Sequence, residues 1–331
     1  MPESFKAFVV NKTDDGFTAG VQELTLDDLP AGDVTVRVSR SSVNYKDGLA
    51  CTPDGRVVRG YPMVPGVDLA GTVTESSDGR FRPGDEVLVT GYDLGVAHFG
   101  GFSEYARLPG DWLVKLPQGL TAREAMALGT AGFTAGLSIL RLEANGLRPG
   151  NGRVLVTGAT GGVGSTAVSM LAGLGYEVSA STGKDTEHDY LRDLGASEIL
   201  SREEVSTLSN RPLERERWAA GVDPVGGETL AYLLRTTKYG GSVASSGLTG
   251  GSVLQTTVLP FILRGVNLLG IESVMCPMPL REALWQRLAT DLKPRGLTQS
   301  IAHEITLDQI PEVTAAILTG GLRGRTVVRL G

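Results

Sequence analysis

The chain has 331 residues, of which 41% are hydrophobic and 21% are charged, a composition typical of globular proteins with a substantial core. Its formal net charge of −6 argues against nucleic acid or an anionic membrane as a partner. Two cysteines, Cys51 and Cys276, are too few for a disulfide framework, and the sequence lacks the uninterrupted run of about 18 apolar residues that predicts a membrane span.

The length predicts two domains at about 100–200 residues each. Residues 1–120 are expected to form mostly β-structure, because several short segments rich in Val and Thr are bounded by Pro, Gly or Asp. The predicted strands lie within 6–12, 33–43, 68–77 and 85–92. The start of the chain lacks the basic region and apolar run of a signal peptide, so we expect a cytoplasmic protein.

A helix is predicted from Thr121, which with Glu124 three residues later forms the pattern of a capping box. From there to residue 299, strands alternate with helices, which favours a doubly wound parallel sheet. Residues 300–331 return to strand, helix and strand, and the last strand, GRTVVRL, could pair back with the first domain.

The sharpest local motif is a glycine-rich turn between a strand and a helix. The apolar strand 154–157 leads into Gly158-Ala159-Thr160-Gly161-Gly162-Val163-Gly164, followed by a helix and a second strand. Such a turn lets the backbone approach a pyrophosphate at the positive end of the helix dipole. The spacing is G-x-x-G-x-x-G rather than G-x-G-x-x-G, and the alternative is a plain strand-to-helix connection. The predicted cofactor contacts here are Thr160, Gly161, Gly162 and Val163.

The end of the next strand indicates which dinucleotide binds. NAD-binding proteins usually place Asp or Glu about 20 residues after the turn, whereas this chain has Ser181-Thr182-Gly183-Lys184. Hydroxyls, a backbone N–H and a lysine suit a 2′-phosphate, so Thr182, Gly183 and Lys184 predict NADP rather than NAD. Arg202 is a candidate second phosphate ligand. The alternative is that both cations are ordinary surface charges.

These motifs, together with LGAS, VDPVGG and YGGSVASSG, resemble the medium-chain dehydrogenase/reductase superfamily along the whole chain. The order of NYKD, YPMVPGVDLAGTV, GTAGFTA and PFILRGVNLLGIESV resembles its zinc-free quinone-oxidoreductase-like group, and within it the NADPH-dependent acrylyl-CoA reductases. The resemblance implies an α/β fold in two domains. One is a GroES-like β-rich catalytic domain (1–124 and 300–331), and the other is a Rossmann NADP-binding domain (125–299). It also implies a homodimer formed through a sheet edge within 261–271.

The resemblance also implies a site without metal. Zinc-dependent relatives carry Cys-His-x-Asp where this chain has Asn44-Tyr45-Lys46-Asp47, and Gly-His-Glu where it has Gly66-Val67-Asp68. The four-cysteine loop of those relatives has no counterpart within 91–110. Zinc needs three or four ligands from Cys, His or carboxylate, and the three histidines here are scattered at 98, 188 and 303.

Without zinc, hydrogen-bond donors must stabilise negative charge that develops on the substrate. The resemblance implies reduction of the C=C bond of a short α,β-unsaturated acyl-CoA, with Asn44, Tyr45 and Asp68 as catalytic candidates. Tyr45 could instead position the nicotinamide. The alternative for this segment is structural, with Asn44 and Asp47 capping a turn or helix and Lys46 pairing with Asp68. We favour the capping interpretation for Asp47.

Further contacts follow from the resemblance. Leu248, Ile262 and Ser273 are implied cofactor contacts, with a plain core position as the alternative for the first two. Arg56, Arg59 and Arg323 are candidate ligands for the phosphates of coenzyme A, and Arg325 is considered with them. For each of these arginines the alternative is an ordinary surface charge. Two competing functions remain, a quinone reductase and an NADPH-binding protein without turnover.

Overall fold

The computed structural model describes residues 2–331 and divides into two compact units. The β-rich unit comprises the chain up to Thr130, Val274–Ala289 and Leu297–Gly331, and the Rossmann unit comprises Ala131–Ser273 and Thr290–Gly296. This division differs from the expected boundaries chiefly at helix α7 (Met278–Leu288), which belongs to the β-rich unit. The buried Arg281 of α7 accounts for the difference, because it donates to the carbonyl oxygen of Thr90 at 2.7 Å.

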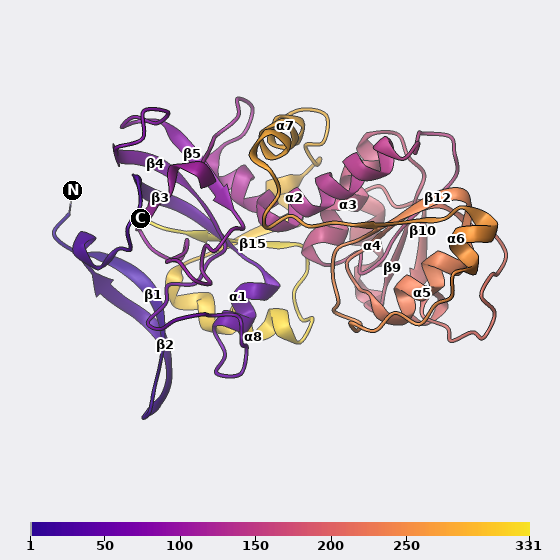
Figure 1. Cartoon of the computed structure of the whole chain (residues 1–331), viewed down its shortest axis with the longest axis horizontal. Helices are drawn as coiled ribbons and strands as arrows, with labels where there is room; N and C mark the ends of the chain where they lie inside the picture. Colours follow the sequence, from indigo (N-terminus) through magenta and orange to yellow (C-terminus); the bar gives the residue numbers. More distant parts are fainter. Residues whose placement is uncertain (1) are drawn as a thin grey trace. The chain divides into compact units, whose positions relative to one another are not determined.

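The β-rich unit is built on a seven-stranded sheet in the order β14-β15-β3-β4-β5-β7, with β6 paired to β3 (Figure 1). These strands are β3 (Val34–Val43), β4 (Asp68–Ser76), β5 (Glu86–Thr90), β6 (Tyr105–Leu108), β7 (Val114–Lys115), β14 (Ala302–Ile305) and β15 (Arg325–Arg329). A separate hairpin is formed by β1 (Phe5–Thr13) and β2 (Gly16–Leu24). The pairing of β15 with β3, with Thr326 opposite Val43, confirms that the last strand returns to this unit.

Two helices of this unit pack on each other, α1 (Tyr45–Ala50) and α8 (Ile310–Leu318), and Figure 1 shows them side by side. Gly48 allows the close approach, because a Cβ there would lie 2.8 Å from Ile317. The short helix that carries the NYKD segment is therefore held by a helix from the other end of the chain.

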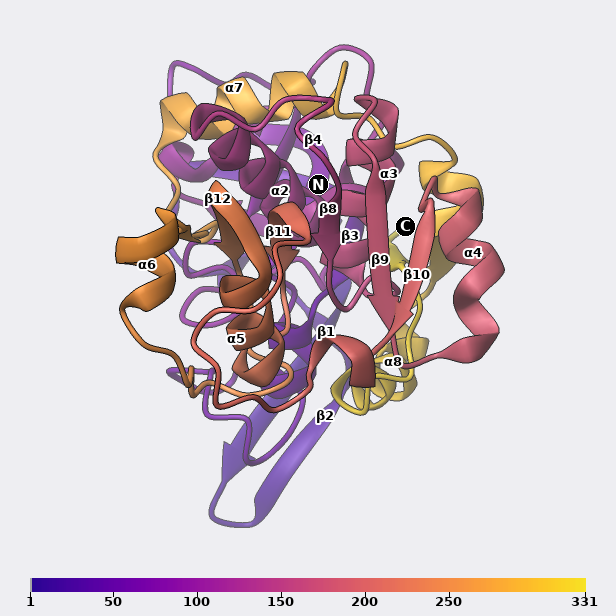
Figure 2. The ribbon, with the colours of Figure 1, turned by 90° about the vertical axis from the view of Figure 1, so that its right-hand side faces the viewer.

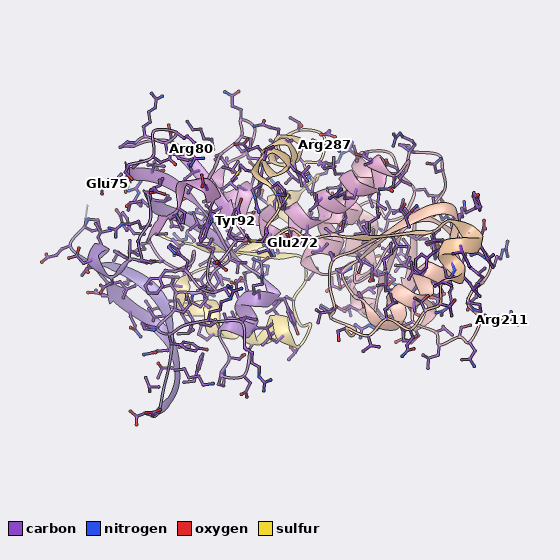
Figure 3. All side chains as sticks on the ribbon, in the orientation of Figure 1. Glu75, Arg80, Tyr92, Arg211, Glu272 and Arg287 are labelled. Carbon is purple, nitrogen blue, oxygen red and sulfur yellow. The ribbon has the colours of Figure 1, made fainter. Side chains whose placement is uncertain are left out.

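The loop after β5 is held by stacked side chains. The ring of Tyr92, labelled in Figure 3, stacks on the ring of Trp112 with centroids 5.4 Å apart. The guanidinium of Arg281 lies over the Tyr92 ring, 4.4 Å from its centroid. The ring of His98 meets Trp112 edge-on. Aromatic and cation–π contacts thus organise this loop, which contains no cysteine.

The Rossmann unit contains a six-stranded parallel sheet in the order β10-β9-β8-β11-β12-β13, seen in Figure 2. The strands are β8 (Val154–Val156), β9 (Val178–Thr182), β10 (Glu198–Ser201), β11 (Trp218–Asp223), β12 (Thr237–Ser245) and β13 (Asn267–Gly270). The helices are α3 (Gly162–Gly173), α4 (His188–Asp193), α5 (Gly227–Thr236) and α6 (Leu259–Arg264). The direction of strand order reverses between β8 and β11, where parallel sheets of this type bind ligands.

Helix α2 (Ala122–Ala144) begins at the predicted capping box, since Thr121 N–H donates to Glu124 Oε2 at 2.9 Å and Glu124 N–H to Thr121 Oγ1 at 3.2 Å. The helix is long and apolar enough to cross a membrane, but 83% of its most apolar stretch is buried inside the protein, as in a core helix. Its backbone is broken at Gly129, where φ is 52° and ψ is −157°. The sequence did not predict this kink.

Candidate active site

Asp47 anchors the segment that begins α1. Its carboxylate accepts hydrogen bonds from the backbone N–H groups of Asn44 (2.8 Å), Gly66 (3.1 Å) and Val67 (3.0 Å). Burial, with the charge of Asp68 as a second cause, raises the pKa of Asp47 to about 7. The capping interpretation of Asp47 is confirmed, and the same carboxylate ties α1 to the loop that leads into β4.

Asp68, the first residue of β4, is fully buried and receives several hydrogen bonds. Its Oδ2 accepts from Ser42 Oγ at 2.6 Å, Asn44 Nδ2 at 2.7 Å and Thr130 N–H at 2.9 Å, while Oδ1 accepts from the Thr130 hydroxyl. Its ionic partner is Arg325, at 3.8 Å. The alternative in which Lys46 pairs with Asp68 is wrong, because the buried partner comes from β15 instead.

Arg325 lies beside Asp68 with only 3% of its side chain exposed. Its guanidinium donates to Ala127 O, Val43 O, Asn44 Oδ1 and Ser42 Oγ at 2.8–3.2 Å. Burial is the main cause that lowers the pKa of Arg325, and the nearby carboxylates of Asp68 and Asp47 oppose that shift. Grouping Arg325 with exposed cations for coenzyme A was therefore wrong.

The structure brings two of the three catalytic candidates into contact. Asn44 is buried and its amide is bound to Asp68, whereas Tyr45, the next residue, has 42% of its surface exposed. An amide that gives one N–H to a carboxylate keeps a second N–H, and with the neighbouring phenol it forms an arrangement of donors that can stabilise an oxyanion. Ser42, Thr130 and Arg325 complete this arrangement, and sequence reasoning missed all three. The one available signal was Arg325, a charged residue beside the apolar pair Val327–Val328 in a strand expected to pair with the β-rich domain.

The glycine-rich turn joins β8 to α3 in the Rossmann unit, as predicted. Gly158 has φ of +52°, and a Cβ at Gly164 would collide with the Gly158 carbonyl, so the turn tolerates no side chain at either position. Gly161 caps α3, and a Cβ there would meet only Gly158 O, at 3.4 Å. An uncovered backbone at the N-terminus of a 12-residue helix suits a pyrophosphate.

The ends of β9 and β10 gather the residues predicted for the adenosine phosphate. Ser201 pairs with Thr182 in the sheet, so Arg202 emerges next to Gly183. A Cβ at Gly183 would lie 2.9 Å from the Arg202 guanidinium, and the N–H of Lys184 donates to Thr182 Oγ1 at 3.1 Å. Within residues 2–331 the structure shows no ion pair for Arg202. The Arg202 guanidinium and the Thr182 hydroxyl therefore lie next to Gly183 and Lys184, where the sequence places no carboxylate, which fits a 2′-phosphate.

Asp223 at the end of β11 was missed by sequence reasoning. It is fully buried and accepts from Thr157 Oγ1 at 2.6 Å and Gly226 N–H at 2.8 Å. Burial is the main cause that raises its pKa. Because Thr157 precedes the glycine-rich turn, Asp223 fixes that turn to the neighbouring loop at the switch point of the sheet.

The other predicted contacts differ in their exposure and in their partners. Leu248 and Ile262 are 63% and 68% exposed, so their alternative interpretation as core residues is wrong. Ser273 bonds to Thr134 at 2.9 Å in the Rossmann unit. Arg59 pairs with Asp93 at 3.3 Å on the surface of the β-rich unit, where Arg56 and Arg323 are also exposed.

Two family models match the chain. The alcohol dehydrogenase GroES-like domain matches residues 30–118, and the family named zinc-binding dehydrogenase matches residues 162–290. Acrylyl-CoA reductase AcuI of Ruegeria pomeroyi is 54% identical over 98% of both chains, and a Bacillus subtilis relative named as a quinone oxidoreductase, YhfP, is 53% identical over 100% of both.

Solved structures agree with these matches. Escherichia coli YhdH, crystallised with NADPH, has a TM-score of 0.94 and 50% identity, covering 98% of this chain and all of that chain. The structure of B. subtilis YhfP with NAD has a TM-score of 0.97 and covers 99% of this chain and all of its own. The fold and the site define a two-domain nucleotide-dependent oxidoreductase. The chain belongs to the medium-chain dehydrogenase/reductase superfamily, in the group that includes AcuI and YhfP.

The name of the second family refers to zinc, and the residues present do not fit that metal. By the resemblance given above, Asn44, Tyr45 and Val67 stand where zinc-dependent relatives carry Cys or His. The oxygens of Asp68 are already engaged by Ser42, Asn44 and Thr130. In the described chain, residues 2–331, no three His, Cys, Asp or Glu side chains are grouped so that they could hold a metal ion. We therefore derive no catalytic step through zinc.

Proposed function

We propose that the protein is an NADPH-dependent reductase of a short α,β-unsaturated acyl-CoA, converting acrylyl-CoA to propionyl-CoA. The observation that carries this proposal is the buried Asn44 amide, which Asp68 holds at 2.7 Å beside the exposed Tyr45. The 54% identity to an acrylyl-CoA reductase over nearly the full length supports the same substrate.

Cofactor binding is assigned to the Rossmann unit. The turn from Gly158 to Gly164 holds the pyrophosphate, and Thr182, Lys184 and Arg202 hold the 2′-phosphate. NADPH supplies a hydride when it is bound. The balanced reaction is acrylyl-CoA, NADPH and one proton giving propionyl-CoA and NADP⁺, with the hydride at Cβ and the proton at Cα.

The residues of the β-rich unit act on the charge that this addition creates. Gain of a hydride at Cβ makes the substrate a thioester enolate, whose oxygen carries negative charge. Asn44 donates its second amide N–H to that oxygen, and the exposed phenol of Tyr45 is a further donor. A carbon–carbon double bond conjugated to a carbonyl can be reduced in this way because the charge is delocalised, so hydrogen bonds suffice without a Lewis acid.

Steady-state oxidation of NADPH with acrylyl-CoA, crotonyl-CoA and a benzoquinone tests this function. We expect turnover with acrylyl-CoA. Deuterium from NADPH labelled at C4 should appear at Cβ of the product, and a reaction run in D₂O should place one deuterium at Cα. Turnover of the quinone alone would contradict the thioester substrate and favour the second candidate, a quinone reductase, which the name of YhfP supports. Tight NADPH binding without turnover of any acceptor would favour a non-catalytic protein.

We also propose that the protein is a homodimer formed through the edge of the Rossmann sheet. β13 is the terminal strand of that sheet, and its Leu268 is 39% exposed. The nearby exposed apolar side chains are Val258, Ile262 and Leu263. A second copy of the chain could pair with this edge and cover these side chains, which would otherwise form a surface prone to association.

Cytoplasmic location is the third proposal. NADPH and acyl-CoA thioesters carry several negative charges and do not cross membranes unaided, so an enzyme that uses both would work where both are made. Immunodetection after cell fractionation, with a periplasmic and a membrane marker as controls, should recover the protein in the cytoplasmic fraction.

A further inference from the structure

We propose that Arg325 is a positioning residue that, together with Asp68, fixes the orientation of the Asn44 amide and so determines which atom faces the substrate. This inference rests on the proposed function, because it concerns the donor that stabilises the enolate. Arg325 is itself buried, and it acts through its hydrogen bond to Asn44.

The contacts of the amide leave one orientation. Arg325 Nη1 donates to Asn44 Oδ1 at 3.2 Å, and Asn44 Nδ2 donates to Asp68 Oδ2 at 2.7 Å. Rotating the amide by half a turn would set its N–H groups against a guanidinium that only donates, and its oxygen against a carboxylate that only accepts. The two charges therefore exclude the alternative orientation.

The orientation leaves one donor available. Nδ2 carries two hydrogens, and Asp68 takes one of them. Within residues 2–331 the structure shows no acceptor for the other. A neutral hydrogen-bond network could satisfy the same amide in either orientation, whereas the buried pair of opposite charges presents an N–H rather than a carbonyl oxygen to the site.

The guanidinium itself is fixed by several acceptors. It donates to the carbonyl oxygens of Ala127 and Val43 and to Ser42 Oγ, and Ser42 in turn donates to Asp68. With Arg325 and Asp68 exposing 3% and 0% of their side chains, water does not compete for these bonds. A planar fork with five donors can meet this set of acceptors, and a lysine ammonium cannot.

The kink in α2 makes room for the pair. A Cβ at Gly129 would lie 2.5 Å from Asp68 Oδ2 and 2.6 Å from both Arg325 Nη2 and Ser42 Oγ. The same break frees the N–H of Thr130 from the helix, so that it donates to Asp68 at 2.9 Å. The helix is thus interrupted at the point where the Asp68–Arg325 pair needs space and one more donor.

A double-mutant cycle between Arg325→Lys and Asn44→Ala tests this role. We expect Arg325→Lys to lower kcat about tenfold or more, with KM for acrylyl-CoA and Kd for NADPH changed less than about twofold, because the loss concerns the transition state. In the Asn44→Ala background the same substitution should lower kcat by less than about twofold. Arg329→Lys is the matched control, since Arg329 lies on the same strand and pairs with Glu304 at the surface.

Equal loss of kcat in both backgrounds would overturn the proposal, because a purely structural role of Arg325 does not depend on Asn44. If Arg325→Lys fails to fold, the charge-balanced pair Arg325→Met with Asp68→Asn replaces it in the same cycle, with the same expectations. Inactivity of the unmodified protein toward acrylyl-CoA would refute the substrate and not this inference. The cycle is then run with the acceptor that the substrate panel identifies.

Discussion

Charged side chains in this protein are used in two different ways. In the β-rich unit, Asp47, Asp68 and Arg325 are buried and act on backbone groups and on Asn44. At the ends of β9 and β10, Arg202 is exposed and Lys184 is half-buried, where they can meet a ligand. A buried charge must be satisfied within the protein, while an exposed cation such as Arg202 can bind a phosphate from solution.

Lys184→Glu should weaken NADPH binding about 10- to 100-fold while leaving NADH binding nearly unchanged, because a charge-assisted hydrogen bond to the 2′-phosphate is lost and a repulsion is added. Fluorescence titration of both cofactors measures this. Arg211→Glu is the control, because it makes the same change of charge at an exposed residue in the loop after β10. Arg211 is labelled in Figure 3. Equal weakening of both cofactors would contradict a phosphate role for Lys184.

Asp47 should make the unfolding free energy depend on pH. Burial raises the pKa of Asp47 to about 7 in the folded protein, against 3.8 for an aspartate in the unfolded chain, so between these pH values the folded state keeps a proton that the unfolded state has released. The contribution of Asp47 is therefore fully present below about pH 4 and is lost as the pH rises through 7. The unfolding free energy of the unmodified protein, relative to Asp47→Asn, should fall with pH by at most about 1.4 kcal/mol per unit.

Urea denaturation of both proteins at several values between pH 4 and 8 measures this difference. A difference that stays constant over that range would mean that Asp47 titrates at the same pH in both states. A difference in unfolding free energy that grows with pH would mean that the pKa of Asp47 is lowered in the folded protein, because its three backbone N–H donors outweigh the effect of burial.

At the scale of elements, the positions of the strand ends decide where chemistry occurs. Asn44 follows β3 and Asp68 begins β4, and the two strands are antiparallel neighbours, so their polar ends meet. In the Rossmann sheet, Gly158, Gly183 and Asp223 lie at the carboxyl ends of parallel strands, where such sheets bind ligands. The break in helix α2 at Gly129 leaves the space that the Asp68–Arg325 pair occupies, because a side chain there would collide with both residues.

Gly129→Ala should lower the unfolding free energy by about 2 kcal/mol or more and reduce kcat. A left-handed φ costs a residue with a Cβ about 1–2 kcal/mol, and the methyl group would also displace Asp68, Arg325 or Ser42. Gly173→Ala in α3 is the matched control, since a Cβ there meets no atom within 4 Å, and it should be neutral or stabilising. Thermal unfolding of both variants checks the prediction, and an equal effect of the two would refute it.

At the scale of the whole molecule, exposed apolar side chains gather at one edge of one unit. Leu268 on β13 and the exposed side chains of α6 lie at the terminal strand of the Rossmann sheet. A net charge of −6 keeps chains apart unless such an edge is complementary to itself. The oligomeric state is therefore expected to depend on this edge.

Light scattering after size-exclusion chromatography should give a mass twice that of the 34.8-kDa chain. Leu268→Lys should convert it to the monomer, because the charge would be buried against the partner strand. Leu208→Lys, at a leucine that is 76% exposed in the loop after β10, should leave the mass unchanged. A monomeric unmodified protein, or a dimer unaffected by Leu268→Lys, would contradict the proposed interface.

The sequence by itself determined the elements whose causes are local. The capping box at Thr121, the glycine-rich turn after β8 and the missing carboxylate after β9 depend on neighbouring residues, and the structure has the turn and the helix start where they were expected. The return of the last strand followed from its apolar pattern and its resemblance to relatives.

Only the tertiary structure decided which buried groups meet. Arg325 lies 257 positions after Asp68 in the chain, and no periodicity or propensity relates them. The partner of Asp68, the kink at Gly129 and the assignment of α7 to the β-rich unit all arise from burial, which forces each charge and each backbone donor to find a partner in space. The same requirement pairs Asp68 with Arg325 rather than with Lys46, the alternative partner that the sequence offered, because Lys46 can stay partly in water while Arg325 cannot.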